Sequence, residues 1–147
     1  MKNDYQYKFY NGHELKGNNK LFSEIEKIVN EYDYMGDILN FLSSESIVCC
    51  MTSNDVIMGF SWIALCEEQQ IAELSWFVIN KQEIKGLDGH YLLDKTLNFC
   101  TSKNIKFLKF NCGLEAWERI KNKNKLLSNY GYIVDENEKD YDISIKV

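Results

Sequence analysis

Hydrophobic residues recur along this chain with two different spacings, and the spacing separates candidate strands from candidate helices. Short apolar runs and two-residue alternation predict strands, with turn residues such as Asn, Asp and Gly between them. The predicted strands cover residues 5–12, a hairpin over 46–65 that turns around Ser53-Asn54-Asp55, residues 70–79, residues 106–112 and a final hairpin over 132–147. On the strand over 70–79 we expect Ala72, Leu74, Trp76 and Val78 to share one face.

Three- and four-residue spacing of apolar residues predicts amphipathic helices. These helices cover residues 19–32, 36–44, 89–105 and 115–131. The helix over 89–105 has a clear apolar face, formed by Leu92, Leu93, Thr96, Leu97 and Cys100. Asn11 and Gly12 are expected in a turn after the first strand, with His13 in the loop that follows.

The order of these elements predicts one α+β domain that spans residues 1–147. Strands and helices follow in the order β-α-α-β-β-β-α-β-α-β-β, with no repeat and no linker. The strand–helix–strand passage over 71–112 predicts a parallel strand pair, because such crossovers join parallel neighbours. The hairpins make the other pairs antiparallel, so we expect a mixed, mostly antiparallel sheet with helices on both faces.

Composition and charge narrow the classes of partner. The chain has 147 residues, of which 45% are hydrophobic and 27% charged, as in ordinary globular domains. Its net charge of −5 argues against non-specific binding to nucleic acid or anionic membrane. The start "MKNDYQYKFY" has no apolar signal core, and no stretch reaches the ~18 apolar residues of a membrane span, so we expect a cytoplasmic protein.

The five cysteines form neither a C-x-x-C pair nor a Cys/His ligand pattern. We therefore expect no metal site and no disulfide framework, but reduced and mostly buried thiols. Neighbouring Cys49 and Cys50 should point to opposite faces of their strand.

The element order, together with two short motifs, resembles the GCN5-related N-acetyltransferase (GNAT) family over nearly the whole chain. The motifs are "AELSWFVI" followed by a glycine-bearing turn and "YLL", and "NYGY" at the start of the final hairpin. The resemblance implies a sheet that splays between its fourth and fifth strands, where acetyl-coenzyme A (acetyl-CoA) enters and an amine of a small molecule or protein is the acceptor. It leaves self-association as a homodimer open.

The resemblance also implies where the cofactor binds. The backbone of Phe77, Val78 and Ile79 would pair with the pantetheine arm, and an amide near Val78 would polarise the thioester carbonyl. Amides at the start of the next helix would hold the pyrophosphate. These residues are Lys85, Gly86, Leu87, Asp88, Gly89 and His90.

The glycine-bearing turn departs from the family pattern Gln/Arg-x-x-Gly-x-Gly/Ala. With Gly89 in the last position, Ile84 stands at the first and Leu87 at the fourth, while Asp88 adds a negative charge beside the phosphates. From the residues alone, this stretch fits either a weakened phosphate cradle or a plain strand-to-helix turn with Asp88 as helix N-cap.

Glu73 is the candidate general base, because the histone-acetylating branch of the family has a glutamate on this strand. The alternative is a strand carboxylate that faces solvent or a cross-strand lysine. Leu127 stands where many members carry the tyrosine that protonates the leaving thiolate, and the role does not transfer to Tyr130. A GNAT fold kept as a non-catalytic acyl-CoA-binding or regulatory module is therefore the second hypothesis.

Overall fold

The computed structural model describes residues 5–31, 45–80, 89–115, 117–118 and 130–147. It contains a seven-stranded sheet in the order β1-β2-β3-β4-β5-β7-β6. The strands are β1 (Gln6–Asn11), β2 (Ser46–Ser53), β3 (Val56–Cys66), β4 (Ile71–Ile79), β5 (Phe107–Gly113), β6 (Tyr132–Glu136) and β7 (Asp140–Lys146). The β4–β5 pair is parallel and the other pairs are antiparallel, so the predicted α+β class with a mixed, mostly antiparallel sheet is confirmed.

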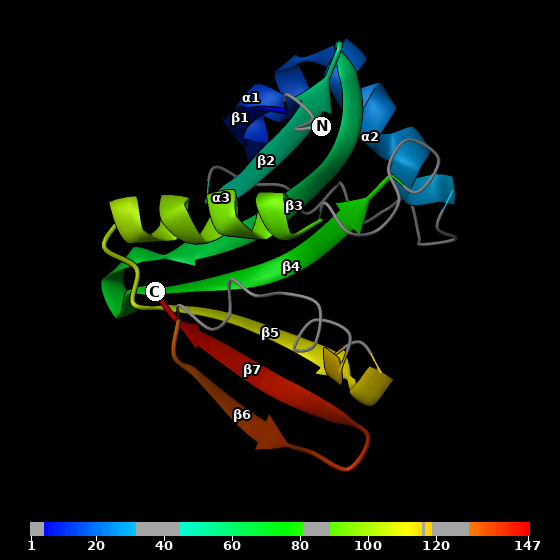
Figure 1. The fold of residues 1–147 in the computed structure, drawn as a ribbon. Coiled ribbons are helices and arrows are strands. Elements are labelled where there is room, and N and C mark those ends of the chain that lie inside the picture. The colour runs from blue at the N-terminus through cyan, green and yellow to red at the C-terminus, as the bar shows by residue number, and fades with distance from the viewer. Residues whose placement is uncertain (1–4, 32–44, 81–88, 116, 119–129) are drawn as a thin grey trace.

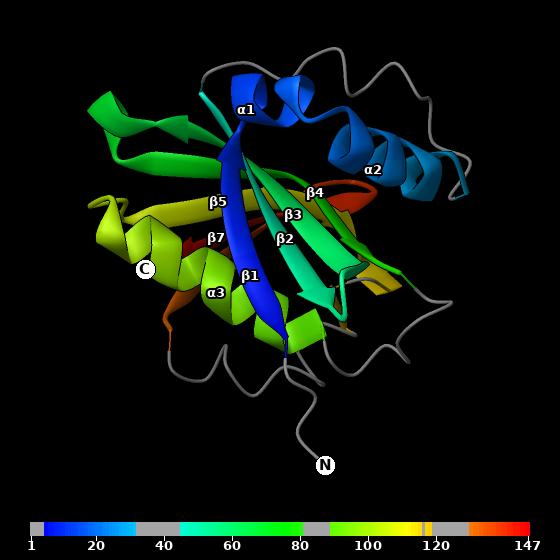
Figure 2. The same ribbon diagram turned by 90° about the horizontal axis from the view of Figure 1, so that it is seen from above.

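Helices cover both faces of the sheet, as expected (Figures 1 and 2). The described helices are α1 (Gly12–Gly17), α2 (Asn19–Glu31), the short 3-10 helix η2 (Glu67–Gln69) and α3 (Gly89–Ser102). α1 and α2 lie on one face, where Ile25 and Val29 pack with Val48 and Phe60 of the sheet. α3 lies on the other face.

The apolar face predicted for α3 is confirmed, because Leu92, Leu93, Thr96, Leu97 and Cys100 are all buried. Cys49 packs with Leu92 on this side of the sheet, whereas Cys50 packs with the α1–α2 cluster. The two neighbouring thiols therefore do face opposite ways. Cys100 is also buried, while Cys66 is exposed.

The β2–β3 hairpin turns where the sequence predicted it. Asn54 and Asp55 have φ values of 51° and 65°, in the left-handed region. Consecutive left-handed residues match the right-handed twist of the two strands, and Asn and Asp tolerate this conformation.

The turn expected at Asn11 and Gly12 is wrong, since α1 begins there. The Asn11 side chain accepts a hydrogen bond from the Glu14 amide at 2.8 Å, and the Glu14 carboxylate accepts one from the Asn11 amide at 3.1 Å. This reciprocal cap stabilises a helix start. His13 consequently lies in α1 rather than in a loop.

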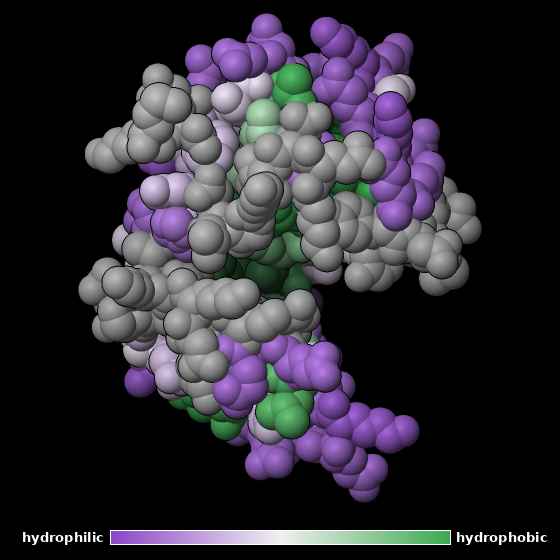
Figure 3. Space-filling view, turned by 45° about the vertical axis from the view of Figure 1, so that its right-hand side comes forward, coloured by the Kyte–Doolittle hydropathy of each residue, from purple (hydrophilic) through white to green (hydrophobic). Residues whose placement is uncertain are grey.

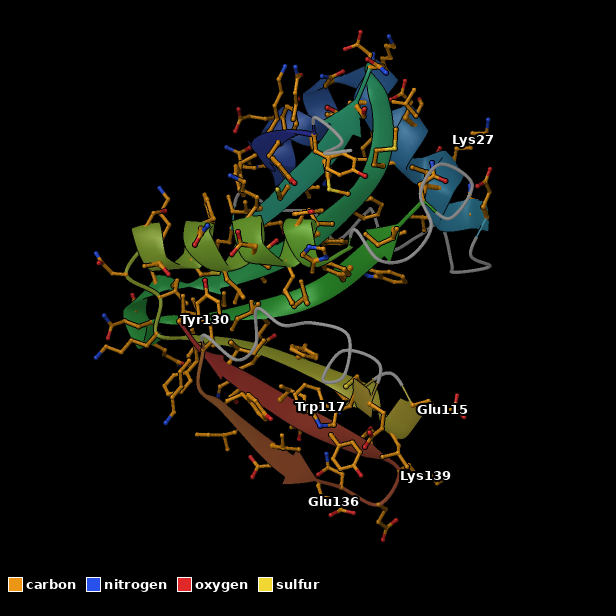
Figure 4. All side chains as sticks on the ribbon, in the orientation of Figure 1. Lys27, Glu115, Trp117, Tyr130, Glu136 and Lys139 are labelled. Atoms are coloured by element: carbon orange, nitrogen blue, oxygen red, sulfur yellow. The ribbon has the colours of Figure 1, made fainter. Side chains whose placement is uncertain are left out.

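The other predicted helices are covered in part. α2 corresponds to the helix predicted over 19–32, and the helix predicted over 36–44 lies outside the described residues. Leu114, Glu115, Trp117 and Glu118 are helical, as expected for the start of the last helix, most of which is not described. Trp117 lies over the β6–β7 hairpin and contacts the Tyr132 ring edge-on at 5.3 Å between centroids (Figure 4). Among the described helices, none is long and apolar enough to cross a membrane.

Candidate functional site

A bulge in β4 changes the face on which its side chains lie. Trp62 of β3 pairs with Trp76, but the next residue, Ile63, pairs with Leu74, so Ser75 is an extra residue in β4. An extra residue reverses the inward and outward alternation beyond it and bends the strand.

The shared face expected for Ala72, Leu74, Trp76 and Val78 is therefore wrong. Ala72 and Leu74 pack on the α3 side of the sheet, whereas Trp76 and Val78 pack with α1 and α2. The uninterrupted apolar alternation of the sequence contains no sign of the inserted residue.

The β4–β5 pair opens immediately before this bulge. Parallel pairing joins Ile71 with Phe107, Ala72 with Leu108 and Glu73 with Lys109, and then stops, although both strands continue. The strands diverge from this point in Figure 1. In Figure 3 the surface is hollowed between the half built on β1–β4 and the half built on β5–β7, with hydrophobic side chains at the floor. We call this opening the wedge; the splay expected between the fourth and fifth strands is confirmed.

The N-terminus of α3 lies beside the open end of β4. A Cβ atom on Gly89 would come within 3.3 Å of Ile79 Cγ1 and 3.7 Å of the Phe77 ring. Glycine thus allows the first residue of the helix to approach the strand closely. The first turn of α3 holds no acidic residue, so its amide dipoles are not offset there by a carboxylate.

The structure brings several of the predicted cofactor-binding residues together. The side chains of Phe77 and Ile79 lie against Gly89, and Val78 points to the α1–α2 face. His90 follows Gly89 in the first turn of α3, with its ring centroid 3.9 Å from that of Tyr91. The remaining predicted residues, Lys85, Gly86, Leu87 and Asp88, lie outside the described residues.

Glu73 is the last residue of β4 that pairs with β5, two positions before the bulge. Its neighbours in the strand pack on the α3 side, so its own side chain points to the α1–α2 side, where it is exposed. It lies directly opposite Lys109, another exposed residue. This position, at the closed end of the wedge, suits a proton acceptor, and it equally suits a cross-strand ion pair.

Tyr130 is remote from the open end of the wedge. It precedes β6, and the first residue of β6 pairs near the end of β7. The end of β7 in turn pairs with the start of β5, where β4 and β5 are still paired. Figure 4 shows Tyr130 on this side of the molecule. Burial, and less strongly the charge of Asp94 on α3, raises the pKa of the Tyr130 phenol. Leu127 lies outside the described residues.

Two features near the wedge were not predicted from the sequence, namely the bulge at Ser75 and the polar edge of Trp62. The Trp62 side chain is 5% exposed, and its indole N–H is buried without a hydrogen-bond partner among the residues that the structure describes. Trp76 lies opposite it on β4. Buried N–H groups are nearly always paired, so this unpaired donor on the α1–α2 side of the sheet is unusual. Trp62 falls in the hairpin predicted over 46–65, but strand periodicity carries no information on how its indole N–H is paired.

Comparison with solved structures identifies the fold. The chain resembles Tetrahymena GCN5 with a TM-score of 0.74 and 14% identity, over 97% of this chain and 96% of that one. It resembles Escherichia coli ElaA with a TM-score of 0.68 and 15% identity, over 98% and 100% of the two chains. The aminoglycoside 6'-N-acetyltransferase from Enterococcus faecium has a TM-score of 0.68 and 11% identity, over 95% and 94%.

No family model and no curated protein matches the sequence. The similarity to the solved structures shows that the chain has a GNAT-like fold, as predicted from the sequence. Its sequence identity to each of these three structures is 15% or less.

Proposed function

We propose that this protein is an acyl-CoA-dependent N-acyltransferase that transfers an acetyl group from acetyl-CoA to an amine. The observation that carries the proposal is the wedge: β4 and β5 separate beyond Glu73, and the N-terminus of α3 lies against the open end of β4. A strand edge that has separated from its neighbouring strand can pair with an extended amide chain, and a helix N-terminus supplies backbone donors for a diphosphate. The similarity to acetyltransferases of this fold supports the same assignment.

In this proposal the backbone of Phe77, Val78 and Ile79 pairs with the pantetheine arm. The pyrophosphate binds the amides of 85–90, namely Lys85, Gly86, Leu87, Asp88, Gly89 and His90. Because this cradle is built mainly from main-chain groups, replacing the usual side chains weakens it without removing it.

The reaction is one acyl transfer. A neutral amine nitrogen attacks the thioester carbonyl carbon, the C–N bond forms, and the C–S bond breaks as coenzyme A leaves as a thiolate. Glu73 accepts the proton lost by the amine and then releases it to solvent, while the thiolate takes a proton from solvent, so that the products are the amide and coenzyme A. A backbone amide near Val78 stabilises the negative charge that develops on the carbonyl oxygen. The acceptor is the amine of a small molecule or of a protein, and the proposal requires no metal.

Binding is tested by thermal unfolding with and without acetyl-CoA. A ligand that binds only the folded state at 100 times its Kd stabilises that state by about 2.7 kcal/mol, so the melting temperature should rise by several degrees. No rise at millimolar acetyl-CoA would contradict the proposal.

Catalysis is tested by coenzyme A release over a panel of amines, using Glu73→Gln and the control Glu136→Gln. Glu136 lies on β6 at the far side of the hairpin from the wedge (Figure 4). Loss of a general base should lower kcat by about 10²–10⁴ in Glu73→Gln and leave the control unchanged. An unchanged rate in Glu73→Gln would remove Glu73 from the mechanism.

The non-catalytic acyl-CoA-binding module is the second candidate function. It is favoured by one observation, the exposed position of Glu73 opposite Lys109. Stabilisation by acetyl-CoA with no coenzyme A release over the amine panel would select this candidate.

A further inference from the structure

A second concave surface lies at the other end of β4, remote from the wedge. It has a volume of about 670 Å³ and is lined by residues at the end of β1, in α1, at the start of β2, at the end of β3, in the η2 turn and near the C-terminal end of α3. We call it the η2 groove. The wedge begins beyond Glu73 and opens towards Ile79, whereas η2 immediately precedes Ile71, so η2 and the open end of the wedge are about 26 Å apart along β4 at ~3.3 Å per residue.

The floor of the η2 groove is aromatic. Phe9 of β1 and Phe99 of α3 stack with ring centroids 4.6 Å apart and an interplanar angle of 16°. Phe9 remains 36% exposed. The Lys103 ammonium nitrogen lies 5.7 Å from the Phe99 centroid, so this floor already holds one cation of the protein itself.

The rim of the groove is acidic. Among the described lining residues, four are glutamates (Glu14, Glu45, Glu67 and Glu68) and one, Lys103, is a cation, so their formal charges sum to −3 (four negative, one positive). Carboxylates around an aromatic floor create a field that attracts cations, and the floor accommodates their apolar stems.

The adjoining strand edge indicates the shape of the occupant. β1 is the terminal strand of the sheet order and pairs with β2 alone among the described strands. Its last residues, including Phe9, line the groove. An extended peptide can add to such an edge through main-chain hydrogen bonds, with alternate side chains directed towards the groove.

We propose that the η2 groove is a docking site for an extended, Lys- or Arg-bearing segment of a partner protein. The segment lies along β1, its cationic groups face Glu67 and Glu68, and their aliphatic stems cover the Phe9–Phe99 pair. Lys103 competes with the incoming cations for the same aromatic surface. This site is independent of acyl-CoA binding and of the amine that is acetylated.

The proposal is tested by fluorescence anisotropy with a labelled peptide of about ten residues in which Lys or Arg alternates with Leu or Gly. The protein variants are the wild type, Glu67→Gln/Glu68→Gln and Lys103→Gln. The control Glu136→Gln/Glu138→Gln removes the same charge from exposed positions on β6 and the β6–β7 turn. A second peptide with Glu in place of every Lys and Arg controls for the apolar residues.

Removing two rim carboxylates should weaken binding of the basic peptide about five- to tenfold, while the control pair leaves it within about twofold. Lys103→Gln should strengthen binding, because it removes the competing cation. Equal weakening in the rim and control variants would show non-specific attraction to an acidic protein and would overturn the proposal. Absence of binding at millimolar peptide would also overturn the proposal. Displacement of the peptide by spermidine at matched charge concentration would overturn it as well, because it would indicate a site for small cations instead.

Discussion

At the residue scale, the wedge depends on glycines that let other elements approach β4. Gly59 of β3 lies so close to β4 that a Cβ atom there would be 2.8 Å from the Val78 carbonyl oxygen and 3.0 Å from Ile79 Cδ1. The first of these contacts is with backbone, which cannot rotate away. Gly89 makes the corresponding approach from α3, against side-chain atoms that can yield more easily.

Gly59→Ala should therefore destabilise the protein by about 1–3 kcal/mol, the usual cost of overpacking. Gly17→Ala is the matched control, because a Cβ atom at that glycine would have no neighbour within 4 Å and should change stability by less than ~0.5 kcal/mol. Urea unfolding of the two variants measures the difference. If Gly59→Ala is as stable as the control, the close approach of β3 to β4 is incorrect.

We expect the thiols to differ in reactivity because they differ in burial, and this difference can be tested at one pH. Burial raises the pKa of Cys49, Cys50 and Cys100 to about 12, so at pH 8 only about one in ten thousand of each is the reactive thiolate. Cys66 is exposed on the rim of the η2 groove. Because a raised pKa keeps the thiol protonated until the pH approaches that value, the three buried thiols should stay unmodified in the folded state.

Iodoacetamide at pH 8, followed by mass spectrometry, should modify Cys66 rapidly and these three cysteines only after denaturation. Modification of Cys49 at the rate of Cys66 in the folded protein would contradict the burial of β2. A Cys66→Ser background would also remove this reactive thiol from assays that detect released coenzyme A.

At the element scale, one buried polar contact fixes α3 on the sheet. The Thr96 hydroxyl donates to the Leu92 carbonyl at 2.8 Å, so in its 2.7 Å contact with Ser61 of β3 it is the acceptor. Both side chains are about 1% exposed. This pair sets the position of α3 over β3, and thereby the position of its N-terminus beside the wedge.

Thr96→Val should lower the free energy of unfolding by about 1–3 kcal/mol, because it leaves the buried Ser61 hydroxyl without an acceptor. Adding Ser61→Ala should recover part of that loss, which a double-mutant cycle measures. Thr101→Val provides the comparison, since Thr101 is exposed and also donates to a carbonyl one turn earlier. Equal losses in Thr96→Val and Thr101→Val would show that the buried pair has no special role.

Elements with one strong period were predictable, and those that depend on register were not. The face of α3 follows from apolar spacing alone, and the β2–β3 turn follows from Asn54 and Asp55. The bulge at Ser75 could not be predicted from the sequence, because the residues on both sides of it are apolar and either register buries them. α1 was missed because Asn-Gly reads as a turn, although Glu14 completes a capping box with Asn11.

At the scale of the whole molecule, β4 connects the two proposed sites. The wedge follows from the end of β4–β5 pairing at Glu73 and Lys109, and the η2 groove lies at the start of the same strand. The sequence predicted the first site through the element order and its resemblance to the GNAT family. It could not predict the second, because the groove combines residues from β1, η2 and α3 that only the fold brings together.

The measurement that tests the account most directly is a crystal structure of the protein grown with millimolar acetyl-CoA. We expect the pantetheine arm between β4 and β5, paired with the backbone of Phe77–Ile79, and the pyrophosphate at the N-terminus of α3 beside Gly89. Acetyl-CoA bound elsewhere, or a wedge that stays without ligand at that concentration, would contradict the central claim.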